Sequence, residues 1–136
     1  GIYAPELICN CPIEYSVIRK ELKRLMALGN PPTAAMCTSD FFAMSVMKIA
    51  NDLKIQMPER LSVMGYCGYP GGRFLTPPLS TVDLHYDAIG RKVVEVLARA
   101  DRWFGRKNVA VPEIIMPHDV VMRESTMVKR VEPLFV

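Results

Sequence analysis

The sequence predicts an α/β fold in which a doubly wound parallel sheet has helices between successive strands. Residues 34–38 and 62–66 are short, mainly apolar runs, which are typical of strands buried on both faces. Amphipathic segments of helical length separate such runs, and the order strand, helix, strand is the unit of a parallel sheet with right-handed crossovers. The chain has 136 residues, 50% of them hydrophobic, so we expect one modest domain with its own core.

The N-terminal part predicts one strand and one helix. Residues 5–10 indicate a strand, and Pro12 suits the first turn of a helix over residues 13–28, which Gly29 ends. Apolar residues recur in this helix every three or four positions and are expected to face a sheet. On the opposite side we favour a solvated face over a phosphate-binding patch for the basic residues Arg19, Lys20, Lys23 and Arg24.

The middle of the chain predicts a strand, a helix, a second strand and a loop. Ser39 and Asp40 follow the strand at residues 34–38, and their side chains can cap a helix over residues 41–53. After the strand at residues 62–66 come three glycines and three prolines within residues 67–78. This composition predicts a shaped loop without regular structure, and loops of this kind tend to carry function.

The C-terminal part predicts a strand, a long helix and an extended segment. The strand covers residues 80–82, and an amphipathic helix follows over residues 86–104 until Gly105 ends it. Apolar residues alternate with prolines over residues 109–121, which indicates short edge strands or extended chain.

Four stretches together resemble the regulatory domain of LacI/GalR-type (lactose-repressor-type) transcriptional regulators. They are residues 32–40 (Pro-Thr-Ala-Ala-Met-Cys-Thr-Ser-Asp), 57–66 (Met-Pro-Glu-Arg-Leu-Ser-Val-Met-Gly-Tyr), 77–82 (Pro-Pro-Leu-Ser-Thr-Val) and 121–126 (Val-Met-Arg-Glu-Ser-Thr). The resemblance covers most of the chain and depends on the order and spacing of these stretches. It implies an incomplete lobe of the periplasmic-binding-protein-like type (type I).

The resemblance also implies how the chain is divided. Residues 1–83 and 107–126 would form the C-terminal lobe of an effector-binding domain, residues 84–106 a helix of the N-terminal lobe, and residues 127–136 a tail. In the family another strand, from upstream of Gly1, lies between the strands expected at residues 5–10 and 34–38. Its absence would leave a slot, and unpaired strand edges favour rearrangement, exchange between copies or oligomerisation.

The function implied by the resemblance is that of the effector-binding and dimerising portion of a cytoplasmic regulator. Such a regulator binds a small-molecule effector, a sugar or a similar compound, and forms a homodimer. It reads DNA through an N-terminal helix-turn-helix, and this sequence contains neither that helix pair nor a basic recognition helix. The net charge of +3 also argues against direct DNA binding by this chain.

The candidate ligand-binding residues lie near the carboxyl ends of predicted strands, where ligands bind in open α/β sheets. They are Ser39, Asp40, Cys67 and Cys11. We expect Asp40 chiefly to cap the following helix, which leaves Ser39 as the better ligand contact.

Cys67 stands where the family commonly has an aspartate that accepts hydrogen bonds from a sugar. A thiol is a poor acceptor, so a sugar bound in the usual way would lose a bond worth roughly 1.5–3 kcal/mol. Either the effector is different or less hydroxylated, or the polar contacts come from elsewhere.

A set of apolar residues has two interpretations. By resemblance it belongs to a dimer contact, where exposed aromatic and methionine side chains are favoured. Ordinary core packing is the alternative. The residues are Phe41, Met44, Met47, Phe74 and Leu75.

Other functional classes have little support in the sequence. No nucleophile motif and no phosphate-binding loop with lysine is present, so we expect neither an enzyme nor a cofactor. The cysteines and the two histidines lack zinc-site spacing, and no segment has the length and composition of a membrane span or export signal. The main alternatives are a periplasmic-type sugar-binding protein of a transporter and an oligomerisation module whose cleft binds nothing.

Overall fold

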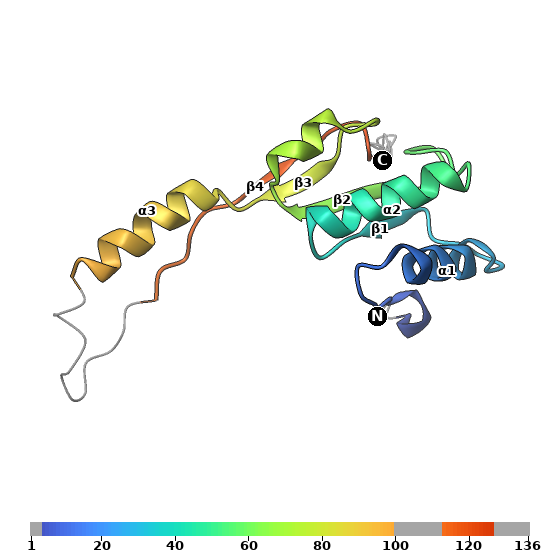
Figure 1. Ribbon diagram of the computed structural model, residues 1–136, viewed down its shortest axis with the longest axis horizontal. Coiled ribbons are helices and arrows are strands. Elements are labelled where there is room, and N and C mark those ends of the chain that lie inside the picture. Colours follow the sequence, from blue (N-terminus) through green and yellow to red (C-terminus); the bar gives the residue numbers. More distant parts are fainter. Residues whose placement is uncertain (1–3, 100–112, 127–136) are drawn as a thin grey trace, which may run out of the picture.

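The centre of the protein is a four-stranded sheet in the order β1-β2-β3-β4 (Figure 1). The computed structural model describes residues 4–99 and 113–126. Strands β1, β2 and β3 are parallel, and β4 is antiparallel to β3. The predicted α/β class is therefore confirmed. The strand bounds are Ala34–Met36 (β1), Ser62–Cys67 (β2), Ser80–Asp83 (β3) and Asp119–Val121 (β4).

Three α-helices and two 3-10 helices complete the described part of the chain. α2 packs against β2, and α1 packs against α2. No helix among the described residues is long and apolar enough to cross a membrane. The α-helices are Tyr15–Met26 (α1), Asp40–Asp52 (α2) and Tyr86–Leu97 (α3), and the 3-10 helices are Pro5–Leu7 (η1) and Pro70–Phe74 (η2).

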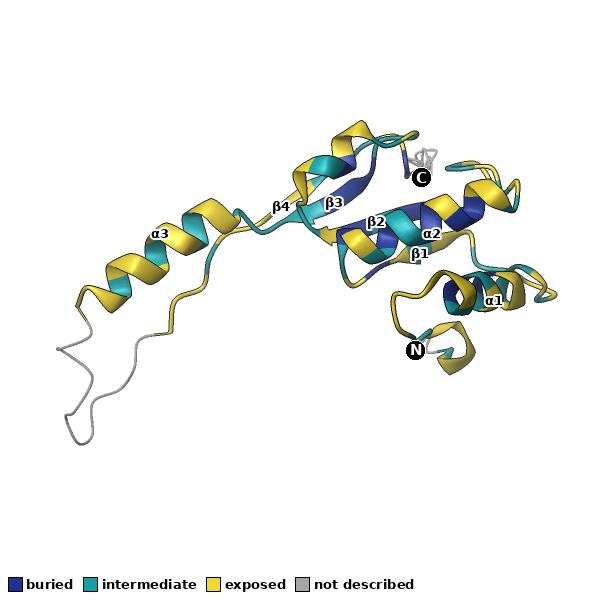
Figure 2. Ribbon diagram, viewed as in Figure 1, coloured by how far each residue is buried: buried dark blue, intermediate teal, exposed yellow. Residues whose placement is uncertain are grey.

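The core lies between α2 and the sheet (Figure 2). On α2, Ala43, Ile49 and Ala50 are fully buried, and Val63 of β2 lies opposite them without solvent exposure. α1 adds two buried side chains and keeps its basic residues on the solvent side, as its 3.6-residue period predicts. Burial of this apolar surface is the main favourable contribution to folding.

The end of the sheet at which β3 begins is closed by a segment from the C-terminal part of the chain. Ser125 is fully buried there and occupies the position beside β2 just before β3 begins. Its Oγ accepts a hydrogen bond from the Ser80 amide (2.8 Å) and donates one to the Val63 carbonyl (2.6 Å). The Ser125 carbonyl accepts from the Val63 amide at 2.8 Å. Residues 123–126 therefore complete the sheet with side-chain and backbone groups together.

The strand predicted at residues 5–10 is wrong. Pro5–Leu7 forms η1, in which the Leu7 amide donates to the Ala4 carbonyl and the Ile8 amide to the Pro5 carbonyl, both at 3.0 Å. Ile8 is left 60% exposed. An apolar run becomes a strand only when a neighbouring strand pairs with it, and among the described residues none pairs with this one.

The glycine- and proline-rich segment after β2 is more regular than predicted. Pro70–Phe74 forms the short helix η2, in which the Gly72 amide donates to the Tyr69 carbonyl at 3.0 Å. Pro70 fits the first position because the missing amide of a proline costs nothing at a helix start. The prediction of a segment without regular structure was therefore wrong for these five residues.

α3 stands away from the sheet and is joined to it by two stretches of chain, one following β3 and one preceding β4 (Figure 1). None of its residues is buried, in contrast to α2 (Figure 2). α3 ends at Leu97, and residues 98 and 99 form a turn, so the predicted helix over residues 86–104 is wrong at these two positions, whereas residues 100–104 lie outside the described part. Residues 114 and 116 lie along α3, beside its apolar side.

Candidate functional site

The carboxyl ends of β1, β2 and β3 meet along one edge of the sheet, which we call the rim. It comprises Ser39, Asp40, residues 67–69, Asp83, His85 and Tyr86. Ser39 follows β1 and Cys67 ends β2, and because these strands are parallel both residues reach the same edge. Both residues therefore lie at the edge of the sheet where they were expected, whereas their contact with a ligand remains a prediction.

Asp40 connects the rim to the sheet from a fully buried position. One carboxylate oxygen accepts from the Thr81 hydroxyl at 2.6 Å, and the other accepts from the Tyr69 amide. Thr81 in turn accepts from the Gly68 amide at 3.3 Å. Because Asp40 is 1% exposed and both its oxygens are engaged, it positions the residue 67–69 turn and is closed to a ligand from solvent.

The helix cap expected of Asp40 is provided by its neighbour instead. The Ser39 Oγ accepts from the Phe42 amide at 3.2 Å, which makes Ser39 the N-cap of α2. Both serine and aspartate can cap a helix. Here Thr81 and Tyr69 engage the Asp40 carboxylate, so Ser39 is the residue that caps α2, and the local sequence does not reveal these two partners. The prediction that Asp40 caps α2 was wrong.

Two glycines allow the close approach that this arrangement requires. A side chain at Gly65 would collide with the Asp40 carboxylate, and one at Gly68 would lie 2.5 Å from Asp83 Oδ1. Gly68 also has a φ of +73°, which favours glycine. β2 and the turn after it thus lie close to two carboxylates, and neither Gly65 nor Gly68 has room for a side chain.

Cys67 adopts an unusual backbone conformation in this turn. Its φ is +112°, a conformation that costs a residue with a Cβ on the order of 1–3 kcal/mol and that is often found at binding sites. Hydrogen bonding to the Cys67 side chain is the largest of the effects that raise the pKa of Tyr86, the first residue of α3. The strained turn and the base of α3 therefore touch at the rim.

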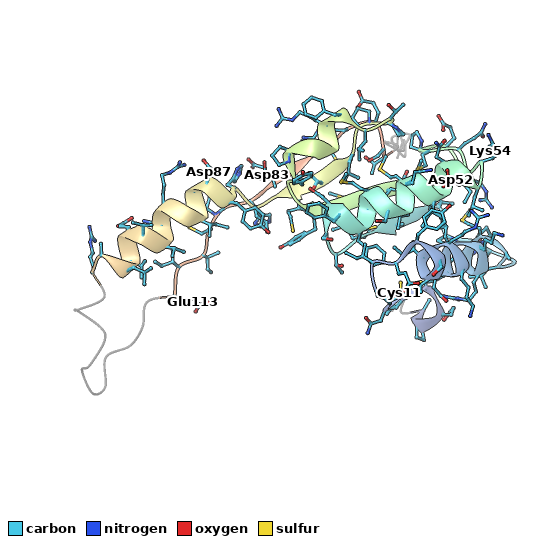
Figure 3. All side chains as sticks on the ribbon, in the orientation of Figure 1. Cys11, Asp52, Lys54, Asp83, Asp87 and Glu113 are labelled. Atoms are coloured by element: carbon cyan, nitrogen blue, oxygen red, sulfur yellow. The ribbon has the colours of Figure 1, made fainter. Side chains whose placement is uncertain are left out.

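Three further polar residues hold together the two chain segments that lead to α3. The His85 amide donates to Asp83 Oδ1 at 2.9 Å, and His85 Nε2 lies 2.9 Å from Asp119 Oδ2 at the start of β4. Asp83 lies where the chain leaves the sheet toward α3 (Figure 3). Sequence analysis missed this group, although the rule that identified Ser39 and Cys67, a polar residue at the end of a parallel strand, also applies to Asp83.

The residues considered for a dimer contact differ in exposure. Phe41 is 55% exposed, with its ring centroid 4.7 Å from that of Tyr69, and Phe74 is 79% exposed. Met44 and Leu75 are partly buried. Met47 is 4% exposed and belongs to the core, so core packing is its role within this chain.

Cys11 lies apart from the rim. It lines an apolar groove beside β1 with Cys37, and neither Ser39 nor Cys67 lines that groove (Figure 3). Burial raises the pKa of the Cys37 thiol to about 12, so this thiol stays protonated and unreactive near neutral pH. Cys11 therefore does not share the rim with the other candidate ligand-binding residues, Ser39, Asp40 and Cys67. Across residues 4–99 and 113–126 no group of cysteine, histidine and carboxylate side chains could hold a metal ion.

Comparison with known proteins shows which family has this sequence pattern and fold. Residues 5–126 match the periplasmic binding protein-like domain. The HTH-type transcriptional repressor CytR of Escherichia coli (strain K12) is 29% identical over 122 residues, which are 90% of this chain and 35% of the repressor. This chain thus spans about a third of the length of that relative.

Solved structures agree on the fold. A putative LacI transcriptional regulator from Bacillus cereus subsp. cytotoxis superimposes with a TM-score of 0.72 at 23% identity, over 85% of this chain and 40% of that one. A LacI family regulator from Arthrobacter sp. FB24, in complex with lactose, superimposes with a TM-score of 0.70 at 26% identity, over 83% and 41% of the two chains.

Proposed function

Because the chain belongs to the periplasmic binding protein-like domain family, we propose that it is the effector-binding and dimerising portion of a LacI-type transcriptional regulator. The observation that carries the proposal is the rim, a ligand-type edge at the carboxyl ends of parallel strands, in a chain homologous to a repressor over 90% of its length. That homology favours a cytoplasmic regulator over the sugar-binding protein of a transporter. It also favours a non-catalytic role.

We propose that the rim forms one wall of the effector cleft. Asp40 is closed to solvent, so the contacts would come from Ser39, Cys67 and the aromatic side chains of Tyr69 and Tyr86, which are 42% and 57% exposed. Aromatic faces and a thiol offer apolar contact and few strong acceptors. This composition supports an effector that is less hydroxylated than a typical sugar, or one whose hydroxyl groups are bound mainly by the opposite wall.

The segments that lead to α3 support a coupling role. Closure of a second lobe over the rim would move α3 relative to the sheet, and the bonds among Asp83, His85 and Asp119 lie where that motion must bend the chain. An effector that binds the closed arrangement better shifts the population toward it. In the full regulator such a shift would change the spacing of the DNA-binding heads.

The effector proposal is tested by an NMR titration of the ¹⁵N-labelled chain with lactose, sucrose and a panel of less hydroxylated small molecules. We expect saturable shifts at the rim amides, and we expect the less hydroxylated compounds to bind more tightly. Tyr86→Ala should weaken binding because it removes the aromatic face, whereas Tyr15→Ala, the same truncation of an exposed tyrosine on α1, should not. A panel that moves no rim amide would contradict the proposal and favour an oligomerisation module.

The same proposal includes a homodimer that involves the exposed rings of Phe41 and Phe74. The change of Phe41 together with Met44 to glutamate should shift a dimer to monomers, because it places charges in an apolar contact. Sedimentation velocity measures this shift. The matched control is Ile115→Glu, at a residue that is 88% exposed and far from α2 in the sequence. Equal sedimentation of the double variant and the parent dimer would remove these residues from the interface.

A further inference from the structure

We propose that His85 is a proton-sensitive clamp, which holds α3 in a fixed position relative to the sheet when its imidazole is protonated and releases α3 when the proton is lost. The clamp lies where residues 83–86 lead from β3 into α3 and where β4 begins at Asp119. It rests on the function proposed above only for its consequence in a full regulator, since the clamp itself needs no effector.

Two carboxylates face each other at this place. Asp83 of β3 and Asp119 of β4 are direct partners in the antiparallel register of the two strands. Side chains paired in this way lie on the same face of the sheet with their Cβ atoms about 4.5–5.5 Å apart, and like charges in such a pair are destabilising. The start of β4 and the end of β3 therefore repel each other unless a positive group lies beside them.

The His85 ring supplies that group when it is protonated. Its Nε2 lies 2.9 Å from Asp119 Oδ2, and its Nδ1 lies 3.8 Å from Asp83 Oδ1. A protonated imidazole is positively charged and donates through both nitrogens, whereas a neutral ring donates through only one. Loss of the proton thus removes the attraction to both carboxylates and leaves their mutual repulsion.

The backbone places the ring between the two strands. His85 has a φ of +52°, a left-handed conformation in which histidine is more frequent than most residues. It is the N-cap residue of α3, yet its side chain makes no capping hydrogen bond. Its amide donates to Asp83 Oδ1 at 2.9 Å. The side chain therefore links α3 to the sheet and does not stabilise the first turn of α3.

The position of α3 depends strongly on this link. None of the residues of α3 is buried, and Asp83 and Asp87 lie on either side of the short connection from the sheet (Figures 2 and 3). Histidine is the side chain that ordinarily changes charge between pH 5 and pH 8. Partly exposed ion pairs are weak, so we expect the ratio of held to released α3 to fall about two- to fivefold over this range.

The other ionisable groups near the ring do not replace it. On α3, Asp87 is paired with Arg91 at 2.9 Å, and hydrogen bonding to Cys67 is the largest of the effects that raise the pKa of Tyr86. His118, which precedes β4, is exposed. In a full regulator the clamp would make the arrangement of the lobes, and with it effector affinity, depend on pH.

Residual dipolar couplings of the whole ¹⁵N-labelled chain at pH 5.5 and pH 8.5 test the clamp without an effector. We expect α3 amides to share the alignment of the sheet at pH 5.5 and to be less aligned at pH 8.5. His85→Asn should remove this difference, because asparagine tolerates the left-handed conformation but carries no charge. The matched control is His118→Asn, at the second of the two histidines, and should keep the difference.

Asp119→Asn is an independent test that leaves His85 in place. It removes one of the two facing charges, so α3 should stay aligned at pH 8.5 and the difference between the two pH values should shrink. If His85→Asn disturbs the amide spectrum of the sheet, Asp119→Asn decides alone.

Three outcomes would overturn the clamp. The first is equal alignment of α3 at both pH values in the parent chain, and the second is a pH response that Asp119→Asn, or a folded His85→Asn, leaves unchanged. The third is a response that His118→Asn abolishes, which would assign it to the other histidine. A failure of effector binding at the rim leaves all these measurements unaffected.

Discussion

The two edges of the sheet differ in how completely the rest of the chain covers them and bonds to their backbone groups. At the closed edge, β4 and residues 123–126 satisfy the backbone of β3 and bury Ser80, Thr81 and Ser125 almost completely. At the β1 edge, Ala34 and Met36 stay exposed beside an apolar groove. Hydrogen bonds at the closed edge join residues more than 40 positions apart in the sequence. On the outer side of β1, by contrast, no described strand pairs with the backbone. Changes at the closed edge should therefore destabilise the fold more than changes at the open edge.

The largest effect is expected at the closed edge, for Ser125→Ala. Loss of this hydroxyl leaves the Ser80 amide and the Val63 carbonyl without their present partner in a fully buried place. Each unsatisfied buried group costs about 1–3 kcal/mol, so for the two groups we expect a decrease of about 2–6 kcal/mol in the free energy of unfolding. Urea denaturation followed by circular dichroism measures it.

Ser45→Ala is the matched control for this change. The Ser45 hydroxyl donates only to the Phe41 carbonyl of its own helix, so its loss should cost less than about 0.5 kcal/mol. If Ser125→Ala and Ser45→Ala destabilise equally, residues 123–126 are not what stabilises the closed edge.

The open side of the sheet was easier to foresee than the closed side. Two of the three parallel strands are visible in the sequence as mainly apolar runs bounded by glycine and polar residues. Parallel strands then bring Ser39 and Cys67 to one rim by topology alone. These are local patterns combined with one geometric rule. The sequence therefore predicted the sheet and the outline of the candidate site.

What sequence reasoning missed depends on distant partners. Nothing near Ser125 indicates that its hydroxyl joins β2 to β3, and nothing near Asp40 indicates that Thr81 and Tyr69 engage its carboxylate. The strand expected at residues 5–10 failed for the same reason, because a strand exists only with a partner. Buried polar bonds and strand pairing are tertiary facts that short-range patterns do not encode.

A smaller effect is expected from pH, through Cys37. This thiol lies next to the open edge but points into the core, and burial raises its pKa from 9.0 to about 12. Above pH 9 the unfolded chain loses this proton while the folded chain keeps it, so stability falls as pH rises. Between pH 8 and pH 10 the loss assigned to Cys37 is about 1.4 kcal/mol.

The measurement compares the parent chain with Cys37→Ala by urea denaturation at both pH values. Lysines and tyrosines also titrate in this range, and the variant shares them, so the difference between the two slopes isolates the thiol. Parallel slopes would mean that Cys37 is accessible, and that the core side of β1 is as open as its edge.

The smallest effect is expected at the open edge itself, for the stability of Met36→Pro. In a central strand a proline removes a bonded amide, so prolines in sheets occur at edge strands or bulges. The Met36 amide points away from β2, and extended backbone suits the residue before a proline, so we expect a cost below about 1 kcal/mol, similar to Met36→Ala. Thermal unfolding of the two variants beside the parent measures the difference. If Met36→Pro costs about 3 kcal/mol or more while Met36→Ala is mild, the amide is already bonded in the folded chain. The β1 edge is then closed, and the contrast between the two edges disappears.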